Sequence, residues 1–579
     1  MNHPVIPIAV QGATRQRKRQ APKGRRVDAQ ALAEVQAALG DEPLRRDRLI
    51  EYLHRLNDRH GQLGTPHLAA LAQQLRLAQT EVFEVATFYH HFEVVSEDAD
   101  GRVPAAPELT VRVCDGLACE MSGARTLLDR LPALLGASVR VIAAPCIGRC
   151  EQAPAVAVHQ HPLAAATADT VLAAVRAGHR THEPAPWIDL ADYGAGGGYA
   201  LLRECVQGQR SADSVIAVLE AAGLRGLGGA GFPAGRKWRL VRNEPAPRLM
   251  AVNIDEGEPG TFKDRWLLER DPHRFLEGVL IAAWAVGIDA VYIYLRDEYH
   301  GCRALLEAEL ARLRAAPPLA DVPGWTLPVL ELRRGAGAYI CGEESAMIES
   351  IEGKRGLPRL RPPYVAQVGL FGRPTLEHNF ETLYWVRELL ERGGEWFAAQ
   401  GRHGRQGLRR FSVSGRVREP GVKLAPAGIT LRELVDEFCG GMLPGHTLYA
   451  YLPGGASGGI LPARLADVPL DFDTLQPYGC FIGSAAVIVL SQHDRAVDAA
   501  RNLMRFFEHE SCGQCTPCRN GTAKARALIE QPQWDLPLLA DLSQVMRDAS
   551  ICGLGQAAPN PVDCVVKYFP EELERPCPT

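Results

Sequence analysis

Hydrophobic residues recur at helical intervals in the first part of the chain. In the segment 45–56, RRDRLIEYLHRL, apolar side chains lie three and four residues apart, which predicts an amphipathic helix. A Thr65-Pro66 pair opens a second helical pattern, and Thr80 precedes a third in a position suited to an N-cap. We therefore predict a small helical unit over residues 41–100.

The pattern then changes to short apolar runs of the kind that form β-strands. Between residues 105 and 180, strand-like and helical segments follow one another in the order LTVRV, ARTLLDRLPALL, VRVIA, AVAVH and ADTVLAAVRA. This order of strand, helix, strand, strand and helix resembles thioredoxin. We predict a compact thioredoxin-like domain over residues 105–180.

The rest of the chain predicts a linker and three further domains. We expect a Pro- and Gly-rich linker over 181–200, a Rossmann-like α/β domain over 201–408, a β-grasp domain of the soluble-ligand-binding type over 409–489, and a helical bundle over 490–579. The longest apolar run, 278–288, ends at an aspartate before a strand-like segment, which predicts a buried helix and no membrane span. The fold class is therefore α/β multidomain.

Charge and composition exclude some functions. The 579 residues include 64 Lys and Arg against 68 Asp and Glu, and a net charge of -4 provides no extended positive field for nucleic acid. The first residues run apolar, VIPIAV, and then basic, RQRKRQAPKGRR, which is the reverse of a secretory signal. We expect a basic, solvated tail over residues 1–40, with a docking arm for an acidic partner subunit as the alternative.

Cysteine usage indicates metal or redox chemistry. Fifteen cysteines are too few for a disulfide scaffold in a chain of this length, and eight of them fall into two tight groups. That distribution favours an intracellular protein, and we expect the cytoplasm. The remaining cysteines are interpreted as ordinary small apolar residues without a nearby thiol: Cys205, Cys302, Cys341, Cys439, Cys480, Cys564 and Cys577.

The first cysteine group suits a [2Fe–2S] cluster. The segment VCDGLACEMSG supplies Cys114 and Cys119, and APCIGRCEQAP supplies Cys146 and Cys150, each pair following the end of a predicted strand. Strands joined by a right-handed βαβ crossover run parallel, so both pairs are expected at the same edge of the sheet. Four thiolates on glycine-bearing loops can then hold the cluster. Zinc and unligated thiols are the alternatives.

The second cysteine group suits a [4Fe–4S] cluster. The segment ESCGQCTPC places Cys512, Cys515 and Cys518 three residues apart, and CGLGQ supplies Cys552 in a glycine-flanked turn. A Cys-x2-Cys-x2-Cys run with a remote fourth cysteine is the pattern of a cubane. A helix predicted to start near Arg519 would direct its positive N-terminal end at the loop. Zinc is the alternative.

A glycine-rich loop marks a ligand site in the α/β domain. The segment LRGLGGAGFPAGRKW contains Gly226, Gly228 and Gly231 in the form GxGxxG. The residues before it look helical, so the preceding strand that a Rossmann fingerprint needs is missing. We interpret the segment as a loop that lets a flat ring or a phosphate approach the backbone, with a plain glycine turn as the alternative.

Acidic residues near this loop suggest a sugar-like ligand. The predicted strand RLMAVNI runs into DEGEPGTFKD, which places Asp255, Glu256 and Glu258 at the carboxyl end of a strand, where α/β sheets bind ligands. Acidic acceptors there suit ribityl or ribose hydroxyls. A second glycine-rich stretch, GAGAYICGEES, precedes a helix with Glu343 and Glu344 in its first turn. A surface acidic loop is the alternative in both places.

These motifs together resemble the NADH-oxidising flavoprotein subunit of respiratory complex I and its relatives. The segments that carry the likeness are GGAGFPAGRKW, NIDEGEPGTFKD, GAGAYICGEES, ESCGQCTPC and CGLGQ. ATFYHHF and the first cysteine group resemble the small [2Fe–2S] partner of that subunit, here fused ahead of it. The resemblance covers about residues 40–570 and implies FMN and NAD beside the [2Fe–2S] and [4Fe–4S] clusters.

Among fused relatives, the chain is most similar to the β subunit of molybdenum- or tungsten-dependent, NAD-linked formate dehydrogenases. The likeness lies in LRDEY, HRFLEG, VSGRVREPGVKLAPAG, YLPGGASGGILPA and MRDASICGLGQAA. It implies a diaphorase that passes electrons from a metal–pterin, iron–sulfur α subunit through the clusters to FMN and as hydride to NAD⁺. The diaphorase subunit of NAD-reducing hydrogenase is the second interpretation, although that family often lacks the N-terminal cluster cysteines. A fused complex I subunit is the third.

The resemblance also implies which residues contact each cofactor. For FMN these are Gly226, Gly228, Gly229, Gly231, Lys237, Asn253, Asp255, Glu256, Tyr339, Gly342, Glu343, Glu344, His378, Asn379 and Thr382. For NAD they are Phe232, Glu258, Arg361 and Tyr364. Glu258, Lys237 and Glu344 are assigned catalytic roles.

Three positions depart from the family pattern. His378 stands where relatives usually carry Asn, and Arg361 and Tyr364 stand where Lys and Phe are usual. The sequence contains no recognisable pterin site or formate pocket, so formate chemistry is expected in a partner. A non-catalytic electron-transfer or scaffold protein is the competing hypothesis, and flavin fluorescence with NADH-dependent dye reduction would distinguish the two.

Overall fold

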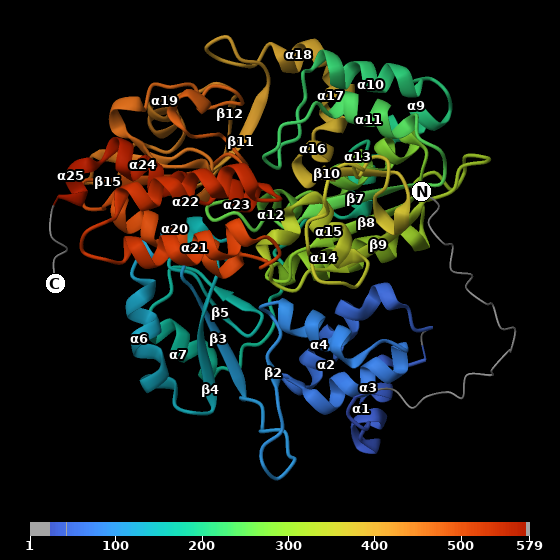
Figure 1. The fold of residues 1–579 in the computed structure, drawn as a ribbon. Helices are drawn as coiled ribbons and strands as arrows, with labels where there is room; N and C mark the ends of the chain where they lie inside the picture. The colour runs from blue at the N-terminus through green and yellow to red at the C-terminus, as the bar shows by residue number, and fades with distance from the viewer. Residues whose placement is uncertain (1–23, 42, 575–579) are drawn as a thin grey trace, which may run out of the picture.

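The computed structural model describes residues 24–41 and 43–574, and the chain is built from helical, thioredoxin-like, α/β, β-grasp and C-terminal helical parts (Figure 1). The N-terminal helices and the thioredoxin-like sheet lie next to each other on one side of the molecule. The α/β domain and the two C-terminal domains lie on the other side. The α/β multidomain class predicted from the sequence is confirmed.

The N-terminal unit consists of short helices packed around a common core. Its helices are α1 (Ala29–Leu39), α2 (Leu49–His60), α3 (Thr65–Leu75) and α4 (Gln79–Phe88). The prediction of a tail over residues 1–40 is wrong for α1, because Asp28 caps this helix by accepting from Ala31 N at 2.8 Å and its apolar face is buried. Residues 1–23, where the tail prediction also falls, lie outside the described residues.

The thioredoxin-like domain has a four-stranded sheet in the order β4-β3-β5-β6. Its elements are β3 (Leu109–Cys114), α5 (Leu117–Met121), α6 (Ala124–Leu135), β4 (Val139–Ala144), β5 (Val156–Val158), β6 (His161–Leu163) and α7 (Ala168–Arg176). Strands β3 and β4 are parallel, as the crossover argument predicts, and β5 runs antiparallel to β3. Both cysteine pairs therefore leave the sheet at the same edge.

The segment predicted as a linker over 181–200 contains a helix. Asp189 accepts hydrogen bonds from Ala191 N and Asp192 N, both at 3.0 Å, and so caps α8 (Leu190–Ala195). Trp187 just before it donates to Glu309 Oε1 at 2.7 Å, which anchors the segment on the α/β domain. The Pro and Gly content suggested a linker. Part of the segment is nevertheless ordered by the Asp189 cap and by the Trp187–Glu309 hydrogen bond.

The α/β domain is built on a parallel sheet in the order β10-β7-β8-β9. Its strands are β7 (Arg248–Ile254), β8 (Ile288–Leu295), β9 (Val329–Arg334) and β10 (Thr375–Asn379). Its main helices are α10 (Ala212–Ala221), α11 (Ala234–Arg242), α12 (Lys263–Leu268), α13 (Pro272–Val286), α14 (His300–Ala315), α15 (Glu344–Ile351) and α16 (Phe380–Tyr384).

Helix α13 contains most of the longest apolar run, and nearly all of its residues are buried against the sheet. Strand β8 follows it directly, so the prediction of a buried helix followed by a strand is confirmed. Among the described residues, the structure has no helix with the length and apolar character needed to span a membrane.

A five-stranded mixed sheet forms the β-grasp domain, in the order β12-β11-β15-β13-β14. Its strands are β11 (Leu408–Gly415), β12 (Gly421–Pro426), β13 (Leu448–Leu452), β14 (Leu461–Pro462) and β15 (Ala486–Ser491). The predicted order of strand, turn, strand and helix is present, because α19 (Leu431–Glu433) continues as a π-helical turn after β12. Strands β11 and β15 pair in parallel at its centre.

The C-terminal domain is a helical bundle next to the β-grasp sheet. Its helices are α20 (Ala496–Glu510), α21 (Thr516–Ile529), α22 (Leu536–Ala549), α23 (Gly553–Ala557), α24 (Asn560–Tyr568) and α25 (Pro570–Leu573). These helices lie between the β-grasp domain and the thioredoxin-like sheet (Figure 1). The long helix α20 therefore reaches both the thioredoxin-like domain and the loop that carries the second cysteine group.

Candidate functional site

The first cysteine quartet is assembled at one edge of the thioredoxin-like sheet. Cys114 ends β3 and Cys119 lies in α5, while Cys146 lies in the loop that follows β4 and Cys150 begins the short 3-10 helix after this loop. All four side chains are buried. The Cys146 and Cys150 sulfurs are 3.3 Å apart, and contacts with the Cys119 and Cys146 thiols raise the pKa of Cys114. The structure therefore brings together the four predicted ligands.

Residues of the α/β domain hold the loop that carries Cys146 and Cys150. Arg296 donates to Cys146 O at 2.7 Å, and Arg265 donates to Gly148 O at 3.0 Å. Phe262 packs against both cysteines in a small buried cluster. The segment between β7 and α12, which includes the predicted DEGEPG loop, thus lies directly against the first cysteine site.

The second quartet is assembled from two turns of the C-terminal bundle. Cys512 and Cys515 lie in the loop between α20 and α21, Cys518 lies in the first turn of α21, and Cys552 precedes α23. Helix α21 begins at Thr516, earlier than the start near Arg519 that we predicted, so its N-terminal end includes a ligand. Burial raises the pKa of Cys518 to about 11 and that of Cys552 to about 12.

Helix N-termini suit this quartet to an anionic cluster. Cys515 occupies the N-cap position of α21, and Cys552 occupies the N-cap position of α23. The positive ends of two helix dipoles therefore face the thiols and act against burial, which raises the pKa of Cys518 and Cys552. Cys512 and Cys515 remain half-exposed, in contrast to the fully buried first quartet.

A single zinc ion would need its four thiolates gathered around one point. Four thiolates around one zinc lie about 3.8 Å apart, because each is about 2.3 Å from the metal in a tetrahedron. In the part of the chain that the structure describes, the groups of three ligand atoms within 4.8 Å of one another consist of His, Asp and Glu, and none includes a cysteine. Neither quartet therefore brings three of its sulfurs within 4.8 Å of one another among the described residues.

The glycine-rich loop lies over the carboxyl end of β10. Helix α10 precedes it and α11 follows it, so the absence of a Rossmann strand before the glycines is confirmed. Leu227 N donates to Thr382 Oγ1 at 3.0 Å, and a Cβ on Gly228 would lie 3.0 Å from Asn379 Cβ. Gly229 and Gly231 have positive φ angles of 128° and 66°, which a residue with a Cβ adopts at a cost. Glycine is therefore needed for both the backbone turn and the close approach.

The carboxyl ends of β7 and β10 form the floor of this site. Asn379, the last residue of β10, is directly paired with Asn253, the last residue but one of β7. Asn253 Nδ2 donates to Gly342 O at 2.9 Å, which brings the second glycine-rich stretch to the same edge. Lys237 Nζ donates to Glu377 O at 3.0 Å and lies 4.0 Å from a Glu344 oxygen.

Two buried polar atoms at this edge have no partner within the described chain. They are Glu377 Oε2 and Asn379 Nδ2. Burial also raises the pKa of Glu377 well above its usual range. Buried polar atoms normally have hydrogen-bond partners, so these two indicate a ligand that accepts from the amide and donates to the carboxyl group. FMN fits, because its ribityl hydroxyls can do both.

The resemblance implies FMN contacts from the turn EHNFET (377–382), which begins at Glu377, but Glu377 was not named individually as a site residue. The signal that could have identified it is positional, because it lies on β10 beside the carboxyl end of β7.

Several other predicted FMN residues have side chains that are already engaged by the protein. Glu256 accepts from Asp264 N at 2.7 Å, Arg265 N at 3.0 Å and Tyr299 OH at 2.8 Å, and thereby caps α12. Glu343 caps α15 through Ser345 N and Ala346 N. These carboxylates order the loops around the site.

His378 is also engaged by a protein partner. The Trp238 indole N–H donates to His378 Nε2 at 2.7 Å, and burial lowers the pKa of His378 well below its usual range. The imidazole is therefore neutral and buried on β10, where relatives usually carry Asn.

Asp255 lies beneath the same loops. It is buried, and burial raises its pKa well above the usual range. Its Oδ2 lies 3.5 Å from the positions that a Cβ on Gly257 or Gly342 would take. Asp255 therefore sits where the two predicted FMN loops meet.

Glu258 connects the α/β domain to the β-grasp domain. Its Oε1 accepts from Ser457 N and Ser457 Oγ, each at 2.7 Å, and its Oε2 accepts from Tyr339 OH. Burial raises the pKa of this carboxyl group. Ser457 is a contact that the sequence reasoning missed, although its glycine-rich surroundings in YLPGGASGG were noted.

The other residues predicted for NAD are more open to solvent. Phe232 is 38% exposed and Tyr364 is 56% exposed. Arg361 pairs with Glu343 and lies 3.0 Å from Glu344, so a line of charges runs from Arg361 through Glu344 to Lys237. Exposed aromatic rings next to a charged edge are suitable for stacking and phosphate contacts.

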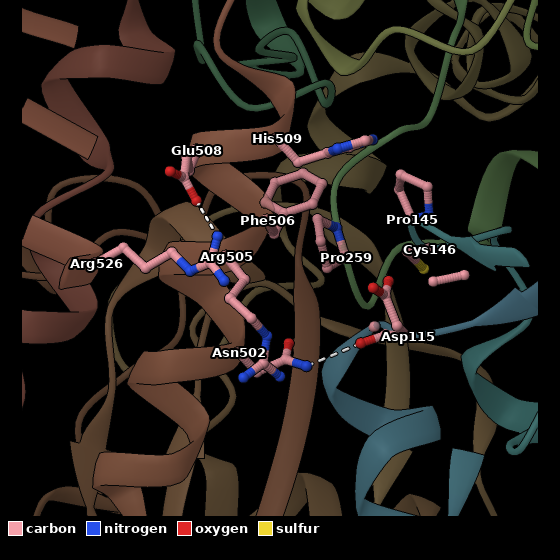
Figure 2. Close-up of a pocket in the computed structure, with 12 residues that line it drawn as sticks. Asp115, Pro145, Cys146, Pro259, Asn502, Arg505, Phe506, Glu508, His509 and Arg526 are labelled. Carbon is pink, nitrogen blue, oxygen red and sulfur yellow. Dashed lines mark hydrogen bonds and ion pairs between the residues drawn. The ribbon is translucent and has the colours of Figure 1, made fainter. Parts of the chain in front are cut away.

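A pocket of about 380 Å³ separates the first cysteine site from helix α20. Figure 2 shows Asn502, Arg505, Phe506 and His509 on one helix, facing Cys146 and its neighbours. Asn502 Nδ2 donates to Asp115 O at 2.8 Å, which ties the helix to the strand that carries Cys114. The C-terminal end of α20 then leads to Cys512, so this one helix contacts both cysteine sites.

The interpretation of Cys480 and Cys564 as cysteines without a nearby thiol is wrong. Their sulfurs lie 3.6 Å apart and are buried between the β-grasp and C-terminal domains. The two positions are far apart in sequence, so only the tertiary structure could reveal this contact. Cys577 lies outside the described residues.

Comparison with protein families assigns a known domain to each of the three cofactor regions. Residues 35–178 match the thioredoxin-like [2Fe-2S] ferredoxin family, and residues 219–388 match the Nuo51 FMN-binding domain. Residues 498–576 match the NADH-ubiquinone oxidoreductase-F iron-sulfur binding region. The predicted cofactors, namely FMN, NAD, a [2Fe–2S] cluster and a [4Fe–4S] cluster, are therefore confirmed.

Individual relatives agree with these matches. The chain is 42% identical over 404 residues to the F 2 subunit of NADH-quinone oxidoreductase in Rhizobium meliloti, which covers 67% of this chain and 96% of that protein. It is 41% identical over 377 residues to the mitochondrial NADH dehydrogenase [ubiquinone] flavoprotein 1 of Dictyostelium discoideum, covering 62% and 78%. A chain of a crystal structure of an NAD⁺-reducing [NiFe]-hydrogenase in the H2-reduced state superimposes with a TM-score of 0.79 and 34% identity, with 92% of each chain covered.

Proposed function

The chain belongs to the family of NADH-oxidising flavoprotein subunits found in NADH-quinone oxidoreductases, and from this premise we propose that it is the diaphorase subunit of an NAD-dependent formate dehydrogenase. In this role it exchanges electrons between NAD(H) and a partner subunit that carries the metal–pterin centre. The observation that carries the proposal is the presence, in one chain, of an FMN-type edge and two complete cysteine quartets.

The bound groups supply complementary electron chemistry, because nicotinamide exchanges hydride, iron–sulfur clusters exchange single electrons and a flavin can exchange either. We propose that the flavin approaches the backbone closely at Gly226, Gly228, Gly229 and Gly231. Asn379 and Thr382 contact this glycine-rich loop and hold it in place. We assign the balance of a negative flavin ring to the Lys237 ammonium, which lies 4.0 Å from a Glu344 oxygen at the charged edge.

The nicotinamide is assigned to the open side of the same site. Phe232 and Tyr364 offer exposed rings for stacking, and Arg361 offers a guanidinium for a phosphate. Glu258 is assigned to the carboxamide of the nicotinamide. The carboxylate now accepts hydrogen bonds from Tyr339 and Ser457, and the carboxamide would replace these donors or join them.

The domain assignment follows from the same sites. We propose that the thioredoxin-like domain holds the [2Fe–2S] cluster through Cys114, Cys119, Cys146 and Cys150, and that the C-terminal bundle holds the [4Fe–4S] cluster through Cys512, Cys515, Cys518 and Cys552. The half-exposed thiols of the second quartet favour that cluster as the one facing the partner.

Formate as the partner's substrate is supported by the sequence likeness described above. The four N-terminal cysteines that hydrogenase relatives often lack are all present and buried together in this chain. The α subunit would carry molybdenum or tungsten, because this chain offers no pterin motif. The predicted cytoplasmic location stays a prediction.

A diaphorase subunit of an NAD-reducing hydrogenase is the second candidate. The specific observation in its favour is the hydrogenase chain that superimposes over 92% of this chain, a greater share than the NADH-quinone oxidoreductase relative covers. The fused architecture is thus shared with that class of enzyme. Both candidates require NADH-dependent dye reduction and differ in the donor that the partner oxidises.

The test is an assay of the purified chain with and without its native partner. The chain alone should reduce an artificial dye with NADH and show no formate or hydrogen activity, because it has an NADH site and no site for either donor. The complex isolated through a tag on this chain should reduce NAD⁺ with formate. Hydrogen-driven reduction in the same preparation would replace the first candidate with the second, and absence of NADH-dependent dye reduction by the FMN-containing chain would refute both.

A further inference from the structure

We propose that Glu34, His60 and His67 form a binding site for a divalent transition metal ion of the zinc type, which ties the first three helices of the chain together. The three side chains come from α1, the last residue of α2, and α3. The site is separate from the FMN edge and from both cysteine quartets, and the inference does not depend on the proposed function.

The geometry of the three side chains suits a common ligand. One ligand atom from each lies within 4.8 Å of the other two. His67 Nε2 is 2.7 Å from Glu34 Oε2, and the His60 and His67 rings stack with centroids 4.5 Å apart at an angle of 24°. Ligand atoms around a tetrahedral zinc ion lie about 3.3 Å apart, so the wider separations would shorten and the His67–Glu34 pair would open slightly.

An unpartnered nitrogen points to a missing ligand at this site. His60 Nε2 is buried and has no hydrogen-bond partner. An imidazole nitrogen that is shielded from water usually accepts or donates a hydrogen bond, so its isolation needs an explanation. A metal ion shared with His67 and Glu34 would use its lone pair.

The charges favour a divalent cation. Two imidazoles and one carboxylate form a donor set that zinc accepts, with a fourth position left for water.

The other oxygen of the carboxylate is also held in place. Gln30 Nε2 donates to Glu34 Oε1 at 2.9 Å from the preceding turn of α1. Such an outer contact orients a ligating carboxylate. The other oxygen, Oε2, faces His67 Nε2, and a bound ion would replace the hydrogen bond between these two atoms. The site therefore has three ligands and an orienting neighbour, all within the N-terminal helical unit.

Two other groups of His and acidic residues are less suited to an ion. In the group of His54, His91 and Asp297, the carboxylate already accepts from Arg334 Nε at 2.6 Å, and this guanidinium would repel a cation. In the group of His90, His509 and Glu510, the Glu510 carboxylate accepts from Tyr339 N at 2.8 Å. Glu34 has no arginine partner within the described contacts of this site.

The ion would anchor α1 to the rest of the helical unit. Helix α1 packs on α2 and α3 through one apolar face, and Glu34 is on this helix. Coordination would add a crosslink between three helices without passing through the core. Because the ion binds the folded arrangement only, it should raise the thermal stability of the protein.

The experiment uses the full chain with its clusters and flavin intact. The protein is incubated with zinc chloride, passed through a desalting column, and analysed for zinc and iron by mass spectrometry. We expect one zinc per chain, with no change in iron. The zinc absorption edge should show only nitrogen and oxygen neighbours at about 2.0–2.2 Å, whereas zinc at a cysteine site would show sulfur at about 2.3 Å.

Three variants and one matched control locate the ion. His60→Gln, His67→Gln and the milder Glu34→Gln should each weaken zinc binding at least tenfold and abolish the zinc-induced rise in melting temperature. His403→Asn is the control, because His403 pairs with Glu433 at 3.0 Å on the surface without a third ligand. It should bind zinc as the unaltered protein does.

NADH-dependent dye reduction and iron content serve as the folding check, since none of the three residues belongs to the cofactor sites. Undiminished zinc binding in all three variants, or a zinc–sulfur distance in the unaltered protein, would overturn the proposal. So would failure of the unaltered protein to retain zinc.

Discussion

The two cysteine quartets differ in the elements that form them and in the exposure of their thiols, although each is suited to an iron–sulfur cluster. The first quartet is formed within one small domain, from two loops at one sheet edge, and all four thiols are buried. The second is formed between the ends of helices, and Cys512 and Cys515 are half-exposed. A sheet edge covered by another domain shields the first site, whereas the helix ends leave the second open to a partner.

The two quartets therefore face different parts of the molecule. The first quartet lies against the loop that also carries Glu258, so it belongs to the interior of the molecule. The second quartet is reached from the surface and from α20. If the burial of the thiols distinguishes an internal quartet from a partner-facing one, changes at the two sites should have different effects.

The largest expected effect is on electron transfer from the partner. Cys515→Ala removes one ligand of the exposed quartet, so donor-driven NAD⁺ reduction by the complex should fall at least a hundredfold. NADH should still bleach the flavin at the normal rate, since the FMN edge is untouched. The measurement compares NAD⁺ reduction by the complex with stopped-flow flavin reduction in the same preparation, and unimpaired donor-driven turnover would refute the partner-facing assignment.

The second prediction concerns the loop that links the FMN edge to the buried site. Glu258→Gln removes the charge but keeps the size, so NADH affinity should fall roughly tenfold to a hundredfold, as expected for loss of a charge-assisted hydrogen bond of about 1.5–3 kcal/mol. FMN content should stay unchanged. Both quantities are measured on the same purified protein.

Ser457→Ala is the matched control for this prediction, because it removes a donor to Glu258 while leaving the carboxylate in place. Its effect on NADH affinity should be smaller. If Glu258→Gln instead loses FMN and binds NADH normally, the carboxylate belongs to the flavin contacts.

The third prediction concerns the solvent exposure of the cysteine thiols. A mild oxidant such as ferricyanide should destroy the [4Fe–4S] signal about tenfold faster than the [2Fe–2S] signal, because two of its thiolates are accessible. Electron paramagnetic resonance of the reduced protein follows both signals over time. Equal rates of loss would mean that burial of the cysteines does not control access to the clusters.

The smallest effect is expected at the buried thiol pair. Cys480→Ala should leave iron content unchanged, because Cys480 and Cys564 contact each other and no cluster ligand contacts them among the described residues. The free energy of unfolding should fall by about 1 kcal/mol through lost packing. Iron analysis and thermal unfolding test this, and any loss of iron would show that the two quartets are not the complete ligand sets.

Much of the fold could be predicted because its patterns are local. The strands around Cys114 and Cys146, the buried helix α13 and the order of elements in the β-grasp domain all follow from hydrophobic periodicity. Helix α1 was missed because the basic residues ahead of it dominated the interpretation of its segment. Helix α8 was missed because Pro and Gly content outweighed a single capping aspartate.

The candidate site was predicted only in part. Closely spaced motifs predicted the iron–sulfur and FMN domains, which the family matches confirm, and the structure brings the cysteines of the first motif pair together at one sheet edge. Glu256, Glu343 and His378 were assigned to FMN, yet the structure engages their side chains with Asp264, Ser345 and Trp238. Residues of the same type at adjacent positions can cap a helix or face a ligand, and spacing alone does not distinguish these roles.

The sequence by itself determined which chemistry this protein carries, because cluster ligands and flavin-approach glycines must be of particular residue types at short, fixed intervals. Only the tertiary structure decided which side chains meet across domains: Glu258 with Ser457, Cys480 with Cys564, and His60 with His67 and Glu34. The physical reason is that these contacts depend on how separate elements pack, which is set by the burial of whole helix and sheet faces. A local sequence pattern therefore does not predict which distant side chain will contact a given residue.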